Sequence, residues 1–238
     1  MLMGCSSMHS ICIITARGGS KRIPRKNIRE FCGKPIIAYS IEAALDSDLF
    51  DEVMVSTDDE EIAEVARNYG AKVPFMRSAE ASDDFADTAD VLKEVLCEYG
   101  SLGRDYELFC CVYPTAPFVT AEKLQQSGAL LSEGIEAVVP VTPFSFPPQR
   151  GFLIEEGKVM LADPESFEMR SQDLATMYHD CGQFYWGRTR SFLKSGSMVP
   201  TSTVAYVVPE TEVQDIDNLT DWELAEMKYK NMRRHDEC

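Results

Sequence analysis

The sequence has no apolar run close to the about 18 residues that a membrane-spanning helix requires. Residues 1–10 lack the basic start and the long apolar core of a secretory leader. Eight cysteines are present, but no two have the C-x-x-C spacing typical of zinc sites. Scattered cysteines in apolar stretches are typical of buried thiols in a reducing compartment. We therefore expect a cytoplasmic protein with no membrane partner.

Positive charge is also scarce, because 39 Asp and Glu residues outnumber 23 Lys and Arg residues and the net charge is −16. Such an acidic chain is not expected to bind nucleic acid. The cations are nevertheless concentrated, since residues 17–34 contain seven of them and a single acid, Glu30. A small anion would be attracted to this part of the molecule and repelled by the rest.

An apolar stretch at residues 11–15 predicts a strand that runs directly into this basic segment. Gly18 and Gly19 would let backbone N–H groups approach an anion closely. Positive charge is supplied by Arg17, Lys21, Arg22, Arg25 and Lys26. The spacing fits neither G-x-G-x-x-G nor G-x-x-x-x-G-K-[ST]. We interpret the segment as a loop that binds a nucleoside triphosphate; the alternative is a basic surface loop.

Strand and helix patterns alternate along the first 142 residues. Strands are predicted at 11–15, 52–56, 72–75, 108–113 and 137–142, and the intervening helices include 35–46, one from a capping box at 57–60 to Gly70, and 121–132. Such alternation predicts parallel strands joined by right-handed crossovers. We expect a single α/β domain over residues 10–238.

The pattern changes after residue 142. Residues 143–181 are rich in proline and aromatic residues and include a predicted hairpin at 152–161, so they form an excursion from the sheet. The chain returns through strands at 183–186 and 203–209. A second capping box at 220–223 then predicts a helix to about residue 232.

Asp215 and Asp217 form a further candidate site. Residues two apart on an extended segment point to the same side, so the two carboxylates could share one divalent ion. Mg²⁺ is the expected metal, because it prefers one or two carboxylates together with phosphate oxygens and water. The alternative is that the two charges favour the dipole of the following helix.

Several motifs together resemble the acylneuraminate cytidylyltransferases, and within that family the branch that uses pseudaminic acid. The resemblance covers residues 10–230 and rests on residues 16–27, 31–35, 56–63, 113–118, 177–186 and 214–222. It implies a Rossmann-like, mixed and mostly parallel sheet of the nucleotide-diphospho-sugar transferase type. It also implies an enzyme that transfers CMP from CTP to a nine-carbon sugar acid with the help of Mg²⁺.

The resemblance also implies roles for individual residues. The nucleotide would be bound by Ala16, Arg17, Gly18, Gly19, Ser20, Lys21, Asn27, Arg77 and Thr115. Lys21 and Arg17 would stabilise phosphate charge, while Asp215 and Asp217 hold the metal. His179, Asp180 and Gln183 fall in the segment that faces the sugar acid. Residues 143–181 would exchange with a second subunit as a dimerisation arm; a flexible surface insertion is the alternative.

The sequence departs from the family pattern at Thr15, where proline is frequent, and at residues 86–88, where Thr-Gly-Thr is usual. An apolar pocket wall for the methyl group of pseudaminic acid could come from Phe144, Phe146, Pro147, Phe184, Tyr185 and Trp186, although aromatic residues in strands are more often core. Sialic, legionaminic and Kdo sugar acids remain alternative substrates. A non-catalytic nucleotide-binding regulator is the alternative of another class.

Overall fold

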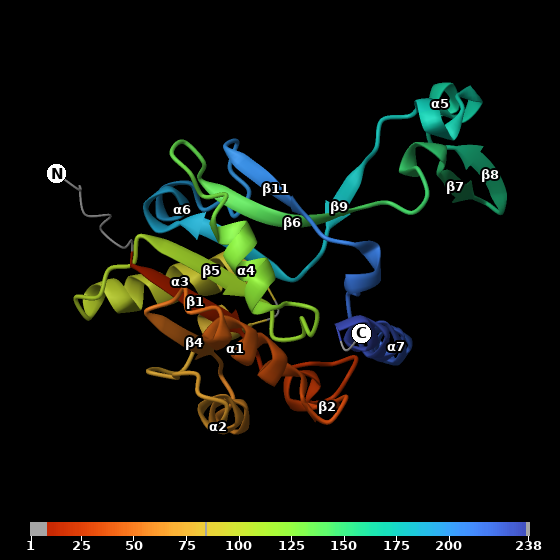
Figure 1. Ribbon diagram of the computed structural model, residues 1–238. Coiled ribbons are helices and arrows are strands. Elements are labelled where there is room, and N and C mark those ends of the chain that lie inside the picture. The colour runs from red at the N-terminus through yellow and green to blue at the C-terminus, as the bar shows by residue number, and fades with distance from the viewer. Residues whose placement is uncertain (1–8, 84, 237–238) are drawn as a thin grey trace.

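The computed structural model describes residues 9–83 and 85–236. Its centre is a seven-stranded sheet. Six strands follow one another in the order β11-β6-β10-β5-β1-β4, and the seventh, β9, pairs with β6. The strands are β1 (Ser10–Thr15), β4 (Glu52–Ser56), β5 (Leu108–Val112), β6 (Ala137–Pro143), β9 (Tyr178–Asp180), β10 (Phe184–Arg188) and β11 (Thr203–Val207). Within the sheet, β9 and β10 run antiparallel to their neighbours, and the remaining pairs are parallel. The expected mixed, mostly parallel α/β sheet is confirmed (Figure 1).

Helices cover both faces of this sheet. They are α1 (Ile36–Asp46), α2 (Glu60–Asn68), α3 (Thr88–Ser101), α4 (Ala121–Gly128) and α6 (Thr189–Ser195). The last helix, α7 (Leu219–Asp236), packs against α1 instead of the sheet. The alternation of side chains along β1 forms two cores. Ile11 and Ile13 pack with residues of α3 and α6, whereas Cys12 and Ile14 pack with residues of α1, α2 and α4. A strand buried on both faces explains why β1 is apolar without alternation.

A third core joins α7 to the segment after the basic loop. It contains Ile23, Phe31, Ile216 and Trp222, and the rings of Phe31 and Trp222 meet edge to face with centroids 5.5 Å apart. Phe31 belongs to a small hairpin formed by β2 (Glu30–Phe31) and β3 (Lys34–Pro35). This packing places the segment around Ile216 beside a loop that lies about 190 residues earlier in the chain.

The predicted strand at 72–75 is wrong. Only one bridge forms there, between Lys72 and Met54. Proline at position 74 has no N–H group to donate, so the ladder cannot continue past it.

Both predicted capping boxes are displaced. α2 is capped by Asp59, whose carboxylate accepts the N–H of Ile62 at 3.1 Å. α7 starts after Asn218, which accepts the N–H of Asp221, while the Asp221 carboxylate accepts the N–H of Asn218. In each case an Asp or Asn stands directly before the helix and provides a stronger cap than the threonine that the pattern favoured.

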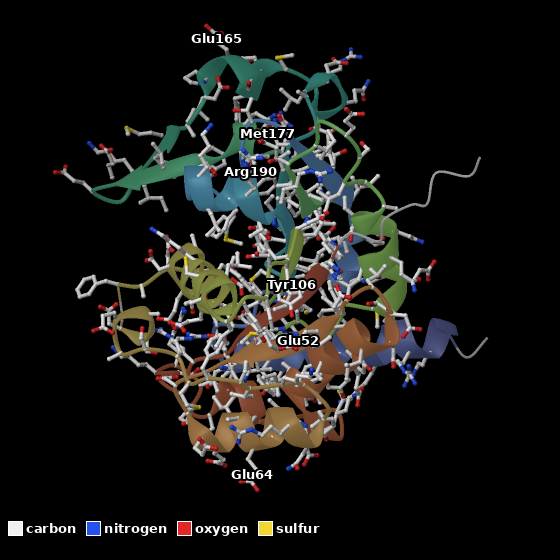
Figure 2. The ribbon with its side chains drawn as sticks, turned by 90° about the vertical axis from the view of Figure 1, so that its left-hand side faces the viewer. Glu52, Glu64, Tyr106, Glu165, Met177 and Arg190 are labelled. Atoms are coloured by element: carbon white, nitrogen blue, oxygen red, sulfur yellow. The ribbon has the colours of Figure 1, made fainter. Side chains whose placement is uncertain are left out.

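Residues 143–181 include the predicted hairpin, formed by β7 (Phe152–Glu155) and β8 (Lys158–Leu161), and a short helix α5 (Pro164–Glu168). Figure 1 shows these elements away from the sheet, connected to it through β6 and β9. In Figure 2, Glu165 lies at the outer end of this arm and Met177 nearer its base. Apolar side chains are exposed on the hairpin: Phe152, Leu153, Ile154, Val159 and Met160.

Within the described residues, no helix combines the length and the apolar character needed to cross a membrane. The cysteines in the same part of the chain all have free thiols. Burial raises the pKa of Cys12, Cys110 and Cys111, so these thiols are protonated and pack as small apolar groups.

Candidate active site

The carboxyl ends of β1 and β5 open into a cavity of about 690 Å³. Open α/β sheets bind ligands at this end of their strands. Four parts of the chain line the cavity: the basic loop, residues of 77–83 and 86–91, residues 113–115, and Asp217. Of the residues predicted to bind nucleotide or metal, the cavity brings together Arg17, Ser20, Lys21, Asn27, Arg77, Thr115 and Asp217. Ala16 is buried below it, and Gly18, Gly19 and Asp215 do not line it.

The basic loop is held in shape from below. The N–H of Gly18 donates to Asp58 Oδ1 at 2.8 Å, and Asn27, which is buried, donates through Nδ2 to the carbonyl of Arg17 at 2.9 Å. A Cβ atom added to Gly18 would lie 2.8 Å from Asp59 Oδ2, whereas one added to Gly19 would meet nothing within 4 Å. Gly18 is therefore required for close packing against α2, which is a different reason from approach to an anion.

Arg25 does not contribute to the cavity, contrary to the prediction for the phosphate loop. Its backbone is left-handed, with φ of 56°, and its guanidinium donates to the Asp59 carboxylate at 2.5 Å and 3.2 Å and also to Glu61. These hydrogen bonds raise the pKa of Arg25 and lower that of Asp59. Arg25 thus fastens the loop to α2.

Lys26 connects the loop to the aspartate segment. Its ammonium donates to the carbonyl of Ile216 at 2.8 Å. Burial lowers the pKa of Lys26, although the nearby charges of Asp217 and Asp215 act in the opposite direction. A cation partly removed from water interacts strongly with an anion in the cavity, so Lys26 is a candidate phosphate contact.

Asp217 lies at the wall of the cavity, and its Oδ1 accepts from Arg22 Nη2 at 2.7 Å. Ile216 is buried between the two aspartates, while Asp215 is exposed. The described residues include no group of three or more His, Cys, Asp or Glu side chains placed to hold a metal ion. Mg²⁺ does not need one when a triphosphate supplies further oxygens. A carboxylate at the wall of this basic cavity fits a metal ion that would bind together with a triphosphate.

Arg77 is anchored at the end of β4. Its Nε donates to Ser56 Oγ at 3.0 Å and its Nη2 to the Ser56 carbonyl at 2.6 Å. Burial lowers its pKa, and the charges of Asp58 and Glu94 partly offset this effect. The guanidinium stays charged because an arginine pKa lies far above neutrality. It is a rigid cation at the cavity wall.

The departure at residues 86–88 has a structural explanation. Asp87 caps α3 by accepting the N–H of Asp90 at 2.9 Å, and Asp90 accepts the N–H of Asp87 in return. Asp87, Thr88 and Thr15 all line the cavity. Sequence reasoning did not single out Thr88 or Tyr113, although Tyr113 stands at the carboxyl end of the predicted strand 108–113, a position that signals a ligand site in this fold class.

The predicted sugar-acid residues lie outside this cavity. His179 is partly buried, with its ring 4.8 Å from that of Phe144. Gln183 is buried and donates through Nε2 to the carbonyl of Glu212 at 2.7 Å, while its Oε1 has no hydrogen-bond partner. Asp180 is exposed at the end of β9. In one chain, therefore, none of the three lines the cavity that the basic loop borders.

The predicted apolar wall is also divided. Phe184, Tyr185 and Trp186 are buried in the two main cores, because β10 is a central strand. Phe144 and Phe146 are exposed at 41% and 84% on the segment that leads into the arm. Of the six residues predicted to form this wall, Phe144 and Phe146 are the ones that keep exposed aromatic surface, which a ligand or a second subunit could cover.

A family model described as cytidylyltransferase matches residues 11–184. A pseudaminic acid cytidylyltransferase from Campylobacter jejuni is 43% identical over 94% of this chain and 97% of its own length. A CMP-N,N'-diacetyllegionaminic acid synthase from Legionella pneumophila is 32% identical over 92% of this chain and 95% of its length. Among solved structures, a CMP:2-keto-3-deoxy-manno-octonic acid synthetase complexed with CTP aligns over 94% of this chain and 99% of its own, with a TM-score of 0.69 and 18% identity.

The structural likeness shows the shared fold, and the sequence matches extend over the basic loop, the segment after β5 and β9. The level of identity over nearly the whole chain goes well beyond a shared loop. The chain belongs to the cytidylyltransferase family.

Proposed function

We propose that the protein transfers CMP from CTP to the anomeric hydroxyl of pseudaminic acid and releases pyrophosphate. The observation that carries this proposal is the cavity in which four loop cations meet Asp217, in a chain 43% identical to a pseudaminic acid cytidylyltransferase. In the reaction the sugar oxygen forms a bond to the α-phosphorus, the bond to the β-phosphate oxygen breaks, and the hydroxyl proton leaves to solvent. The loop cations are Arg17, Lys21, Arg22 and Lys26.

Positioning and charge neutralisation supply most of the catalysis in such a transfer. Lys21 and Arg17 stabilise charge on the phosphates, and Lys26 and Arg77 add cations whose geometry is fixed by Ile216 and Ser56. Asn27 contributes by holding the backbone of the loop. Each role is a proposal for the bound state that follows from which side chains share the cavity.

Asp217, with Asp215 two residues before it, would hold Mg²⁺. When bound, this ion would neutralise phosphate charge and lower the pKa of a coordinated hydroxyl. The donor chemistry supports Mg²⁺, since carboxylate and phosphate oxygens are its preferred ligands.

We further propose a homodimer in which the arm of one protomer completes the sugar-acid site of the other. The exposed apolar side chains of β7 and β8 support this, because isolated hairpins of this kind are rarely stable in water without a partner surface. His179 and the exposed Phe144 and Phe146 would then face a sugar acid from the base of the arm. The free thiols of the described residues agree with activity in the cytoplasm.

Pyrophosphate release tests the proposed function. Purified protein, CTP and Mg²⁺ are incubated with pseudaminic, legionaminic, N-acetylneuraminic and Kdo acids separately, and the products are identified by mass spectrometry. CMP-pseudaminic acid as the preferred product supports the assignment. Preference for another sugar acid would change the substrate but keep the reaction. Binding of CTP without turnover on any of the four would instead favour a nucleotide-binding regulator.

A further inference from the structure

Tyr113 presents a phenol to the substrate cavity, with its hydroxyl 3.3 Å from Thr88 Oγ1. Its backbone is fixed from two sides. The carbonyl accepts from Ser40 Oγ at 2.7 Å, and the N–H donates to the carbonyl of Gln183 at 2.8 Å. Only the side-chain torsions of Tyr113 are therefore left for neighbouring groups to set.

Tyr185 is the neighbour that supports this ring. It pairs with Cys111 across β5 and β10, and Tyr113 lies two residues beyond Cys111, on the same face. The two rings pack with centroids 5.4 Å apart and planes inclined by 54°. Because Tyr185 is buried in the core, its ring forms a fixed support for Tyr113.

Asp180 in turn fixes Tyr185. Its Oδ2 accepts the Tyr185 hydroxyl at 2.6 Å, and its Oδ1 accepts the N–H of Gly182 at 2.8 Å. Burial raises the pKa of both Tyr185 and Tyr113, so both phenols are protonated at neutral pH and can donate hydrogen bonds. A line of contacts thus runs from Asp180 at the base of the arm to the cavity wall.

We infer that Tyr113 is a further substrate-contacting residue, which donates its hydroxyl to the sugar acid, and that Asp180 and Tyr185 are positioning residues that act through it. This inference rests on the proposed function. Tyr113 directly follows β5, which lies between β1 and β10 in the sheet. It lines the cavity together with the basic loop, and its ring contacts Tyr185 of β10.

The arrangement explains how a predicted sugar-acid residue affects the cavity without lining it. Both carboxylate oxygens of Asp180 already accept hydrogen bonds within the protein. Gln183 reaches the same place through its carbonyl, which holds the backbone of Tyr113. Two residues of that segment thus act on Tyr113, Asp180 through the ring of Tyr185 and Gln183 through the backbone.

Steady-state kinetics on Tyr113→Phe, Tyr185→Phe and their double variant test the inference. Tyr113→Phe should lower kcat/KM for the sugar acid by roughly tenfold to a hundredfold, since a hydrogen bond to substrate is lost, and leave KM for CTP within about twofold. Tyr185→Phe should cause a smaller loss of the same kind. The double variant should be no worse than Tyr113→Phe, because the Tyr185 hydroxyl acts only through Tyr113.

Tyr206→Phe is the matched control, because the Tyr206 hydroxyl bonds to Gln126 and lies outside the cavity. It should behave as wild type. Asp180→Asn, a change at an exposed position, should reproduce the Tyr185→Phe phenotype and so separates positioning from loss of folding.

Three results would overturn the inference. Wild-type kinetics for Tyr113→Phe would remove it from the site, and equal losses for CTP and sugar acid together with a lower Tm would indicate a structural role only. If the losses of kcat/KM in the two single variants multiply in the double variant, Tyr185 does not act through Tyr113. If the wild type is active and any of these results is found, only this inference is wrong. If the wild type is inactive on all four sugar acids, the proposed function is wrong as well.

Discussion

Arg22 and Asp217 form an ion pair, with 2.7 Å between Nη2 and Oδ1, although they lie 195 positions apart in the chain. The side chains are 69% and 40% exposed, so the pair contributes at most about 1 kcal/mol. A metal ion could therefore replace Arg22 on Asp217 at little cost. The released guanidinium would still lie at the wall of the cavity, available to a phosphate.

Replacing Arg22 tests this exchange. Arg22→Gln should lower the Mg²⁺ concentration for half-maximal rate about two- to fivefold, because the competing cation on Asp217 is lost. It should also reduce kcat, since a cation near the phosphates is missing. Mn²⁺ binding measured by electron paramagnetic resonance in the presence of CTP checks the affinity directly. Arg29→Gln is the control, because Arg29 lies over the ring of Trp222 instead of in the cavity; an unchanged metal affinity in Arg22→Gln would contradict the exchange.

Asp217→Asn and Asp215→Asn should both reduce activity at fixed Mg²⁺. Recovery at higher Mg²⁺ is expected when the loss is mainly in metal affinity. The effect should be larger for Asp217, which lines the cavity, than for the more exposed Asp215. If the carboxylates served only the dipole of α7, the Tm would fall and the Mg²⁺ dependence of the rate would stay the same.

Lys21→Ala should lower turnover by more than about tenfold and leave the fold intact, because a phosphate-facing cation neutralises charge in the transition state. Pyrophosphate release and circular dichroism on the same sample measure both quantities. A folded variant with the wild-type rate would exclude Lys21 from the site.

Gly18→Ala and Gly19→Ala form a matched pair. The new Cβ in Gly18→Ala would overlap Asp59 and push the loop away from α2, at a cost of about 1–3 kcal/mol. We expect kcat/KM for CTP to fall at least about fivefold, whereas Gly19→Ala meets no atom within 4 Å and should stay close to wild type. Equal losses in the two variants would indicate that ligand approach, instead of packing on Asp59, requires the glycines.

Glu52 links stability to pH at the opposite end of β4. Its carboxylate is fully buried and accepts from Tyr99, from Arg104 at 2.6 Å and from Lys72 at 3.0 Å. Burial alone would raise the pKa of Glu52, but these hydrogen bonds outweigh it and hold the pKa below its usual value near 4.5. A lowered carboxyl pKa stabilises the fold above the unfolded-state pKa, and this contribution disappears as pH falls through the folded-state pKa.

Glu52→Gln should therefore lower the Tm at pH 7, and the difference from wild type should shrink below about pH 4. Thermal unfolding between pH 3 and pH 8 measures both effects. Figure 2 shows the contrast with Glu64, which points outward from α2, so Glu64→Gln is the control and should leave the profile unchanged. A Glu52→Gln difference that is constant with pH would show that charge at this site does not matter.

Ile154 is 74% exposed on the hairpin. If the hairpin forms the dimer interface, Ile154→Asp should separate the protomers and remove activity. Light scattering and pyrophosphate release measure the two outcomes. Mixing Lys21→Ala with a His179 variant should restore part of the activity if each site uses both chains. A wild-type monomer with full activity would end the proposal.

Local signals in the sequence were enough to predict most of the sheet and the basic loop. β1, its glycines and the αβ alternation are each encoded within about twenty consecutive residues. The role of Arg25 was not predictable, because its partner Asp59 is 34 positions away and one cation in a basic loop resembles another. The line from Asp180 to Tyr113 was missed for the same reason, since it depends on β10 lying between β5 and β6.

The attachment of the loop to α2 through Gly18, Arg25 and Asp59 also affects the free energy and the rate with which a nucleotide would bind. Ordering a backbone costs about 1–2 kcal/mol per residue. When the loop is already ordered before the ligand binds, this cost does not reduce the binding free energy. Encounter would then be governed by long-range attraction to the cations, and association should slow as ionic strength rises. The uneven distribution of charge along an acidic chain would thus favour a polyanion before any contact is made.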